Sequence, residues 1–431
     1  TSVGSAQRMK EVAKLITDGE KKIVVLSAMS GTTNTLVEIS DYLYKKNPEG
    51  ANEIINKLET KYKQHIDELF ATPEYKQKGL EIIKSHFDYI RSYTKDLFTL
   101  FEEKVVLAQG ELISTAMVNF YLQECGVKSV LLPALEFMRT DKNAEPDPIY
   151  IKEKLLAQLE LYPDADIYIT QGFICRNAYG EIDNLQRGGS DYTASLIGAA
   201  INASEIQIWT DIDGMHNNDP RIVDKTAPVR QLHFEEAAEL AYFGAKILHP
   251  TCIQPAKYAN IPVRLLNTMD PEAPGTLISN DTEKGKIKAV AAKDNITAIK
   301  IKSSRMLLAH GFLRKVFEIF ESYQTSIDMI CTSEVGVSVT VDNTKHLNEI
   351  LDDLKKYGTV TVDKEMCIIC VVGDLEWENV GFEAKALDAM RDIPVRMISF
   401  GGSNYNISFL IRECDKKVAL QSLSDMLFNG K

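Results

Sequence analysis

Short apolar runs, each bounded by charged or turn-forming residues, recur along the first part of the chain. Lys21–Ala28 is rich in Val and Ile, and similar runs occupy Ser129–Leu132, Ile167–Thr170, Ile206–Thr210 and Pro262–Leu266. Runs of this length predict buried strands. Segments with helical spacing lie between them, so residues 1–280 are expected to form an α/β domain with a largely parallel sheet.

Residues 51–103 interrupt this alternation. The segment is highly charged, and its apolar residues stand at helical spacing, as at Ile54, Leu58 and Tyr62. We therefore expect a helical insertion on the α/β core.

The expected helices and strands become shorter after P-E-A-P-G-T, Pro271–Thr276, and this segment marks a domain boundary. In residues 281–431, S-I-D-M-I…V-S-V-T-V and P-V-R-M-I…N-I-S-F-L-I align at a spacing of about 70 residues. The repeat predicts two small ferredoxin-like modules, over about 296–363 and 364–431. The alternative is an accidental likeness between two α/β hairpins.

Composition narrows the class of partner. The formal net charge of −12 argues against nucleic acid or an anionic membrane as the main partner. We identify no apolar stretch of membrane-spanning length and no signal peptide. Seven Cys without framework spacing fit a reducing compartment, so we expect a cytoplasmic protein.

Two segments near the strand ends suit charged ligands. S-A-M-S-G-T-T-N, Ser27–Asn34, follows the first strand with small hydroxyl residues and a Gly, which suits either a carboxylate or phosphate site or a plain helix cap. Glu111 opens an apolar helix in A-Q-G-E-L-I-S-T. If Glu111 faces inward, it would bind a cationic group. The alternative is an acidic residue in the first turn of a helix, where the helix dipole stabilises it.

The block L-Q-R-G-G-S-D-Y-T-A is the strongest anion-site candidate. Arg187 supplies a forked cation, and Gly188 and Gly189 let the backbone approach a ligand. Ser190 and Asp191 then open a helix of small residues. Helix capping by Asp191 alone does not explain the Arg-Gly-Gly before it.

Ile208–Arg221 reads I-W-T-D-I-D-G-M-H-N-N-D-P-R, a strand end followed by a Gly turn that suits a nucleotide loop. The acidic spacing does not fit a calcium loop. F-G-A-K-I-L-H-P places Lys246 after a Gly, although a lone Lys is usually a solvated surface charge. The sequence has no Walker motif and no dinucleotide fingerprint, and its seven His have no metal-ligand spacing.

Together and in this order, these blocks resemble the aspartokinases of the amino acid kinase family. The matching pieces also include T-S-V-G at Thr1 and the tandem modules, so the resemblance covers essentially the whole chain. It implies an amino acid kinase (carbamate kinase-like) parallel-sheet sandwich with a helical insertion. Two ferredoxin-like βαββαβ ACT modules would follow, with 287–293 contributing to the second.

The resemblance implies phosphorylation of L-aspartate by ATP to give 4-phospho-L-aspartate, the entry step to lysine, methionine and threonine. A carboxylate with a pKa near 4 is already ionised at pH 7, so no strong general base is required. The task is to bring two anions together by positioning and electrostatics. Mg²⁺ is expected with ATP and not from a set of protein ligands.

The resemblance also assigns residues. Arg187 and Glu111 would bind the carboxylate and the ammonium group of aspartate, and Asp191 would act in catalysis together with Arg187. The remaining substrate residues would be Ser27, Thr33, Gly188, Gly189 and Ser190. The ATP site would comprise Ser2, Thr210, Asp211, His216, Arg221 and Lys246. His216 stands where relatives commonly carry Tyr, so we expect weaker or pH-sensitive packing on the nucleotide.

Family members begin the first motif K-F-G-G-T-S, whereas the given chain starts at the Thr. The resemblance implies that a lysine and two glycines precede Thr1, and the lysine would stabilise the transferred phosphoryl group.

In the tail, Arg305–Leu313 and Ser326–Glu334 resemble the effector-binding segments of lysine-sensitive aspartokinases. A Gly-Phe-Leu turn at a helix start offers amides to a carboxylate. The implied effector residues are Met306, Gly311, Phe312, Leu313, Ser326, Ile327, Asp328, Thr332, Ser333 and Glu334. Lysine is the expected effector, with threonine as the alternative because Ala309 replaces a commoner Ser. The resemblance further implies a homodimer through the ACT modules.

Two other functions compete with this one. The first is a kinase of another small acid on the same fold, acting on acetylglutamate, glutamate or carbamate. The second is a catalytically silent amino-acid sensor that binds its ligand through the tail.

Overall fold

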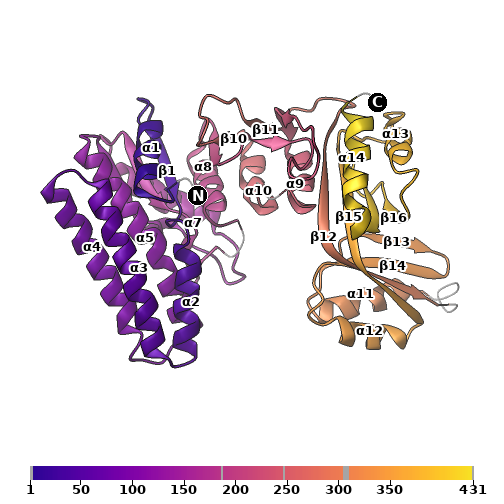
Figure 1. The fold of residues 1–431 in the computed structure, drawn as a ribbon, viewed down its shortest axis with the longest axis horizontal. Coiled ribbons are helices and arrows are strands. Elements are labelled where there is room, and N and C mark those ends of the chain that lie inside the picture. Colours follow the sequence, from indigo (N-terminus) through magenta and orange to yellow (C-terminus); the bar gives the residue numbers. More distant parts are fainter. Residues whose placement is uncertain (1–2, 186–187, 246–247, 304–309, 430–431) are drawn as a thin grey trace. The chain divides into compact units, whose positions relative to one another are not determined.

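The computed structural model describes residues 3–185, 188–245, 248–303 and 310–429. The chain divides into two compact units, Thr1–Gly214 with Leu248–Asn280, and Met215–Ile247 with Asp281–Lys431 (Figure 1). Each unit has its own hydrophobic cores and is treated separately below.

The first unit contains parallel strands covered by helices. Its strands are β1 (Lys22–Leu26), β2 (Ser129–Leu132), β3 (Ile167–Gln171), β4 (Ile174–Arg176), β5 (Ile182–Asn184), β6 (Ile206–Thr210), β10 (Val263–Asn267) and β11 (Thr276–Ser279). Parallel pairing gives the order β1-β3-β2, and β6 and β10 are also parallel. β11 is antiparallel to β10, and β4 and β5 form a hairpin.

Nine helices are described in this unit: α1 (Ala6–Ile16), α2 (Thr32–Tyr44), α3 (Pro48–Leu69), α4 (Pro73–Ser92), α5 (Leu100–Glu124), α6 (Ala134–Phe137), α7 (Pro148–Glu160), α8 (Gly189–Ile201) and α10 (Pro250–Ala259). α2, α3, α4 and α5 lie side by side (Figure 1). The helical insertion expected over 51–103 differs at its end, because α4 stops at Ser92 and α5 already begins at Leu100. A capping box between Thr99 and Glu102 fixes that helix start.

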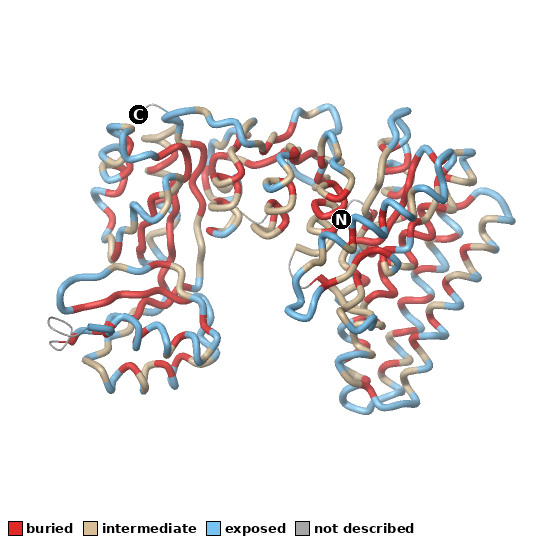
Figure 2. The backbone as a smooth tube through the Cα atoms, turned by 180° about the vertical axis from the view of Figure 1, so that it is seen from behind, coloured by how far each residue is buried: buried red, intermediate tan, exposed pale blue. Residues whose placement is uncertain are grey.

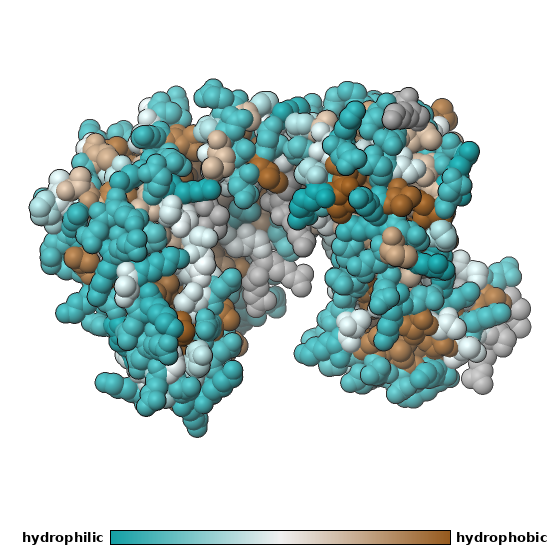
Figure 3. Space-filling view, viewed as in Figure 1, coloured by the Kyte–Doolittle hydropathy of each residue, from teal (hydrophilic) through white to brown (hydrophobic). Residues whose placement is uncertain are grey.

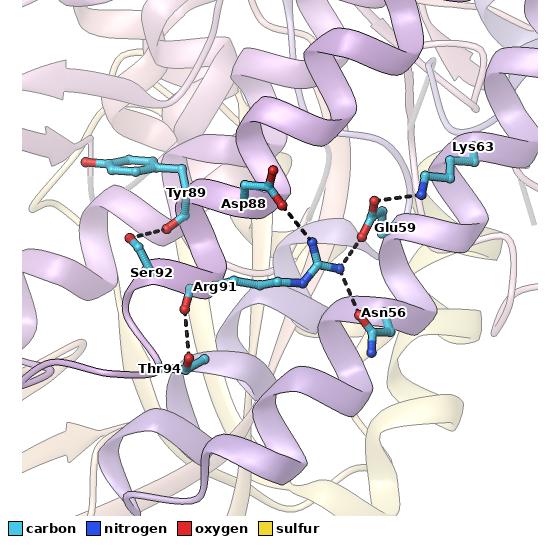
Figure 4. A network of polar contacts seen from close by, with 8 residues as sticks. All are labelled: Asn56, Glu59, Lys63, Asp88, Tyr89, Arg91, Ser92 and Thr94. Atoms are coloured by element: carbon cyan, nitrogen blue, oxygen red, sulfur yellow. Dashed lines mark hydrogen bonds and ion pairs between the residues drawn. The ribbon is translucent and has the colours of Figure 1, made fainter.

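A polar network joins α3 to α4 (Figure 4). Arg91 of α4 donates to the carboxylate of Glu59 and to Asn56 Oδ1 (2.8 Å), both on α3. Lys63 Nζ lies 2.8 Å from Glu59 Oε1. A buried carboxylate between two cations holds a definite geometry, so the network fixes how the two helices align.

α5 is the one helix in the described part of the chain that is long and apolar enough to cross a membrane. Of the 18 most apolar consecutive residues of α5, 72% are buried within the protein, as expected for a central core helix.

The second unit is built on one antiparallel sheet. The sheet order is β13-β14-β12-β15-β17-β16. Its strands are β12 (Ile287–Lys302), β13 (Ile330–Ser333), β14 (Gly336–Val341), β15 (Thr359–Gly373), β16 (Val395–Ser399) and β17 (Asn406–Arg412). Its helices are α11 (Phe312–Ser322), α12 (Leu347–Lys355), α13 (Phe382–Ala389) and α14 (Lys416–Leu427), with a 3₁₀ turn at Glu413–Asp415.

The two long strands β12 and β15 run through both halves of this sheet and carry much of its buried backbone (Figure 2). The first part of β12, Ile287–Lys293, pairs with Ile368–Gly373, and its second part pairs with β14 and with Thr359–Asp363. The sequence pattern predicts separate strands here. Instead, β12 is continuous through an irregularity at Asn295, whose φ of 59° places it in the left-handed region.

Residues 215–247 pack with the C-terminal part, which differs from the domain of residues 1–280 expected from the sequence. This segment holds β7 (Met215–His216), β8 (Pro228–Val229), β9 (Gln231–His233) and α9 (Phe234–Tyr242). Asn217 accepts from the Val290 amide of β12 (2.8 Å), and the Asn218 side chain donates to Leu420 O of α14 (3.0 Å). Because of these hydrogen bonds, residues 215–247 belong to the second unit, although they precede Leu248–Asn280 of the first unit in the sequence.

Candidate active site

The carboxyl ends of β1 and β3 meet the start of α8. Leu26 lies opposite Gln171 in the parallel register, and the Gly172 amide donates to Leu26 O at 2.9 Å. A Cβ placed on Gly172 would stand 2.7 Å from Ser190 Cα, closer than real Cβ contacts allow. Because only glycine permits this approach, Ser27 and Ser190 come to the same edge of the sheet.

The β1–α2 loop, Ser27–Gly31, is fixed by hydrogen bonds to α5. Glu111 Oε1 accepts from the Ala28 amide at 3.2 Å, and Ser114 Oγ donates to Ser27 O at 2.8 Å. A Cβ on Gly110 would lie 2.8 Å from Ala28 Cβ, so glycine lets the helix approach the loop closely.

Glu111 is buried in this region with only 3% of its surface exposed. Burial raises its pKa from 4.5 to about 7, and the hydrogen bond from Ala28 opposes that rise. Its Oε2 has no hydrogen-bond partner among the described residues. A buried carboxylate oxygen without a partner is suited to a cationic group from outside the chain.

The start of α8 is built on two glycines in the left-handed region. Gly188 (φ 79°) is the N-cap and Gly189 (φ 47°) is the first residue of the helix. A Cβ on Gly188 would overlap Cys252 Sγ of α10. Thr193 Oγ1 accepts from the amide of Phe173, which itself has a φ of 68°. These close contacts hold the amides of the helix start at the sheet edge.

Asp191 stands in the first turn of α8. Burial raises its pKa from 3.8 to about 6, and Cys252 lies near enough for the Asp191 charge to raise the pKa of the Cys252 thiol further. A nearby cation would favour the ionised form of this buried carboxyl, so the site suits a positively charged partner.

Four predicted residues lie outside the described residues: Ser2, Arg187, Lys246 and Met306.

The predicted nucleotide residues divide between the two units. In the first unit Thr210 ends β6, and its carbonyl accepts from the amide and hydroxyl of Thr268, both at 2.8 Å. Asp211 follows as an exposed residue. Strand ends of this kind lie where ligands bind in open α/β sheets.

In the second unit His216 and Arg221 flank the remainder of the predicted nucleotide loop. His216 Nδ1 lies 3.0 Å from Thr226 Oγ1. The Arg221 guanidinium makes two hydrogen bonds to Asp219, at 2.9 and 2.7 Å, while the side chain stays 80% exposed. The guanidinium is thus oriented by Asp219 and still open to an anion.

The predicted effector residues of the second unit lie at the start of α11, in the segment before β13 and along β13. Gly311 (φ 84°) caps α11, Phe312 is buried, and Leu313 is partly exposed. Ser326 and Ile327 lie in the segment before β13. Thr332, Ser333 and Glu334 are exposed at the end of β13.

Asp328 is the most buried acid of this set, with its side chain only 1% exposed. Its Oδ1 lies 2.7 Å from Lys293 Nζ and accepts from the Tyr242 hydroxyl at 2.8 Å. Lys293 also contacts Asp342 at 2.9 Å and lies over the Tyr242 ring. Asp328 Oδ2 is buried with no hydrogen-bond partner among the described residues.

Sequence reasoning missed several of these residues. Gly172 follows a strand in T-Q-G-F, which was a usable signal, since a Gly at that place permits a close approach. Cys252 and Lys293 carried no local signal, because their partners lie 64 and 35 residues away. Within the described ranges, no cluster of three or more His, Cys, Asp or Glu that could hold a metal is found.

Two family models match the chain. Residues 1–267 match the amino acid kinase family, and residues 369–427 match the ACT domain.

Curated relatives match over the whole length. The chain is 36% identical to "Aspartokinase 1, chloroplastic" of Arabidopsis thaliana, over all of the chain and 79% of the relative. It is 32% identical to "Lysine-sensitive aspartokinase 3" of Escherichia coli (strain K12), over 99% of the chain and 97% of the relative.

Solved structures of aspartokinases also match the chain over nearly its whole length. The crystal structure of E. coli aspartokinase III with aspartate and ADP (R-state) matches with a TM-score of 0.85 at 31% identity, covering 99% of the chain and 98% of that structure. The T-state structure with lysine and aspartate matches with a TM-score of 0.81 at 32% identity, with the same coverage. The chain therefore belongs to the amino acid kinase family and, within it, to the aspartokinases. The family and fold class predicted from the motifs are confirmed.

Proposed function

We propose that this chain transfers the γ-phosphoryl group of ATP to the side-chain carboxylate of L-aspartate. The observation that carries the proposal is the buried Glu111 carboxylate beside the β1–α2 loop, whose Oε2 has no hydrogen-bond partner in the described part of the chain. The ammonium group of an amino acid would supply that partner. The relatives' names and the aspartate and ADP of the E. coli structure support this substrate pair.

The reaction joins two anions. A carboxylate oxygen of aspartate attacks the γ-phosphorus, the bond from phosphorus to the β-phosphate oxygen breaks, and ADP leaves with the electron pair. Ser27, Thr33 and the Gly188–Ser190 amides would orient the acceptor, and Arg187 would bind one of its carboxylates. Positioning and electrostatics supply most of the catalysis in such transfers.

The nucleotide would bind Thr210, Asp211, His216 and Arg221, together with Ser2 and Lys246. Asp191 would balance the cations around the phosphates. Mg²⁺ neutralises phosphate charge when it is bound with ATP. Since the described residues offer no three-ligand cluster, Mg²⁺ would be held mainly by phosphates and water.

Feedback inhibition by lysine is part of the proposal, with threonine as the alternative effector. The lysine in the T-state structure of the E. coli relative supports it. We also propose a cytoplasmic homodimer through the ACT modules. Large apolar side chains exposed on that unit, including Trp377, Val380 and Val418, support an interface there, and Figure 3 shows hydrophobic residues on its visible face.

The test is aspartate-dependent ADP release with Mg·ATP, with and without lysine. Turnover with aspartate and none with acetylglutamate, glutamate or carbamate is expected, together with suppression by lysine. Activity on another of these acids in place of aspartate would contradict the proposed substrate.

Asp191→Ala separates catalysis from effector binding. Because Asp191 lies in the first unit and the effector residues in the second, the variant should lose ADP release while still binding lysine by calorimetry. Ordinary turnover by Asp191→Ala would remove Asp191 from the mechanism. A wild-type protein that binds lysine without any turnover would favour the silent sensor.

A further inference from the structure

We propose that Tyr62, on the helical insertion, is a positioning residue for the aspartate site. Its hydroxyl lies 2.8 Å from the hydroxyl of Thr32, the first residue of α2 directly after the β1–α2 loop. The inference rests on the proposed function, because it assigns the insertion a part in binding the acceptor.

The contact is buried at both ends. Tyr62 and Thr32 are each 1% exposed, and the Tyr62 ring packs on Phe87 of α4 with centroids 5.8 Å apart. Burial raises the pKa of Tyr62, so its hydroxyl keeps its proton across the working pH range. A satisfied hydrogen bond in such surroundings is costly to break on one side only.

Tyr62 adds a contact from α3 to the contacts that α5 makes with this loop. Glu111 and Ser114 of α5 hold Ala28 and Ser27 at one end of the loop. α3 contacts Thr32 through Tyr62, and Lys61 Nζ of the same helix donates to Ser30 O at 3.2 Å. The core helix α5 and the insertion helix α3 therefore both contribute to the position of the β1–α2 loop.

The Tyr62 contact also affects the orientation of the side chains in the first turn of α2. Successive helical residues point about 100° apart around the axis. With the Thr32 side chain held inward, the neighbouring Thr33 stays partly exposed at the helix start, where it was predicted to bind substrate. Tyr62 also lies near enough to Glu111 for the carboxylate charge to raise the pKa of the Tyr62 hydroxyl.

Tyr62→Phe removes only the hydroxyl and keeps the ring. We expect the KM for aspartate to rise about three- to tenfold, the size of one net hydrogen bond, while the KM for ATP and kcat change by less than about twofold. Thr32→Val should have the same effect from the other side of the contact. The double variant should be no worse than either single variant, because both remove one interaction.

The matched control is Tyr44→Phe. Tyr44 stands at the far end of α2 and donates to Glu103 at 2.7 Å, so the change also removes a tyrosine hydrogen bond from this helix. Its aspartate KM should equal that of the wild type. Hydrogen–deuterium exchange of a peptide covering residues 27–34 should be faster in Tyr62→Phe and Thr32→Val than in Tyr44→Phe or the wild type.

The outcomes separate the two proposals. Wild-type protein without aspartate-dependent turnover overturns the proposed function, and loop exchange then decides whether Tyr62 holds the loop. An active wild type with unchanged aspartate KM in Tyr62→Phe overturns the positioning role. Equal losses of aspartate and ATP affinity, with additive effects in the double variant, also overturn it, since they indicate a general loss of structure.

Discussion

At the scale of single residues, Glu111 shows how a functional group opposes stability. Folding raises the pKa of this carboxyl from 4.5 to about 7. The folded state therefore binds the proton more tightly than the unfolded state. The resulting stability is present in full below pH 4.5 and is lost as the pH rises through about 7.

Glu111→Gln should accordingly stabilise the substrate-free protein at pH 8 by roughly 3 kcal/mol, the equivalent of the pKa difference. A Gln side-chain oxygen can still accept from the Ala28 amide, so the main change is loss of charge. Near pH 5 the difference should shrink to about 1 kcal/mol or less. Urea unfolding at both pH values measures it, and a variant less stable than wild type at pH 8 would contradict it.

Some site residues could be predicted from the sequence and others could not. Ser27 stands directly after a strand and Asp191 in the first turn of a helix, where local pattern indicates an open charged site. Glu111 was expected to open a helix, but α5 begins at Leu100, so Glu111 lies in the helix interior and the expected helix start is wrong. Tyr62 was recognised only as an apolar position of a helix, because its hydroxyl partner is 30 residues away. The Lys293–Asp328 pair joins a strand to a distant loop and is invisible to any local pattern.

At the scale of elements, the meeting of β3 with α8 depends on one missing side chain. Gly172 has no Cβ, and one placed there would lie 2.4 Å from Ser190 Cβ. The strands and helices of the first unit were predictable from alternating apolar runs. The continuity of β12 was not, because Lys293–Asn295 reads as a break and the strand continues past this irregularity by pairing with β15 both before and after it.

Gly172→Ala should push the first turn of α8 away from the sheet edge. We expect a loss of about 1–3 kcal/mol in the free energy of unfolding and a fall in kcat/KM for aspartate. Gly402→Ala is the control, because nothing lies within 4 Å of its added Cβ. Chemical denaturation and steady-state kinetics on both variants measure the effect, and equal behaviour of the two would contradict it.

At the scale of the whole molecule, two compact units with separate cores predict two unfolding events. Saturating aspartate should raise the temperature of the transition of the first unit. Lysine should raise that of the second. At a concentration of 100 times its Kd, a ligand adds about 2.7 kcal/mol to the stability of the unit that binds it.

Scanning calorimetry measures this prediction, with Asp328→Asn as the control that should lose the lysine shift and keep the aspartate shift. A single transition that both ligands move together would show that the units unfold as one.

The ion pair of Lys293 with Asp328 has a consequence for the concentrations to which the protein would respond. The side chain of Lys293 already supplies Asp328 with an ammonium group of the kind an amino-acid effector carries. An external amine must compete with this tethered one, whose effective concentration near the carboxylate is high. The protein would thus carry its own detection threshold, ignoring low effector levels, and the residue at position 293 would set where that threshold lies.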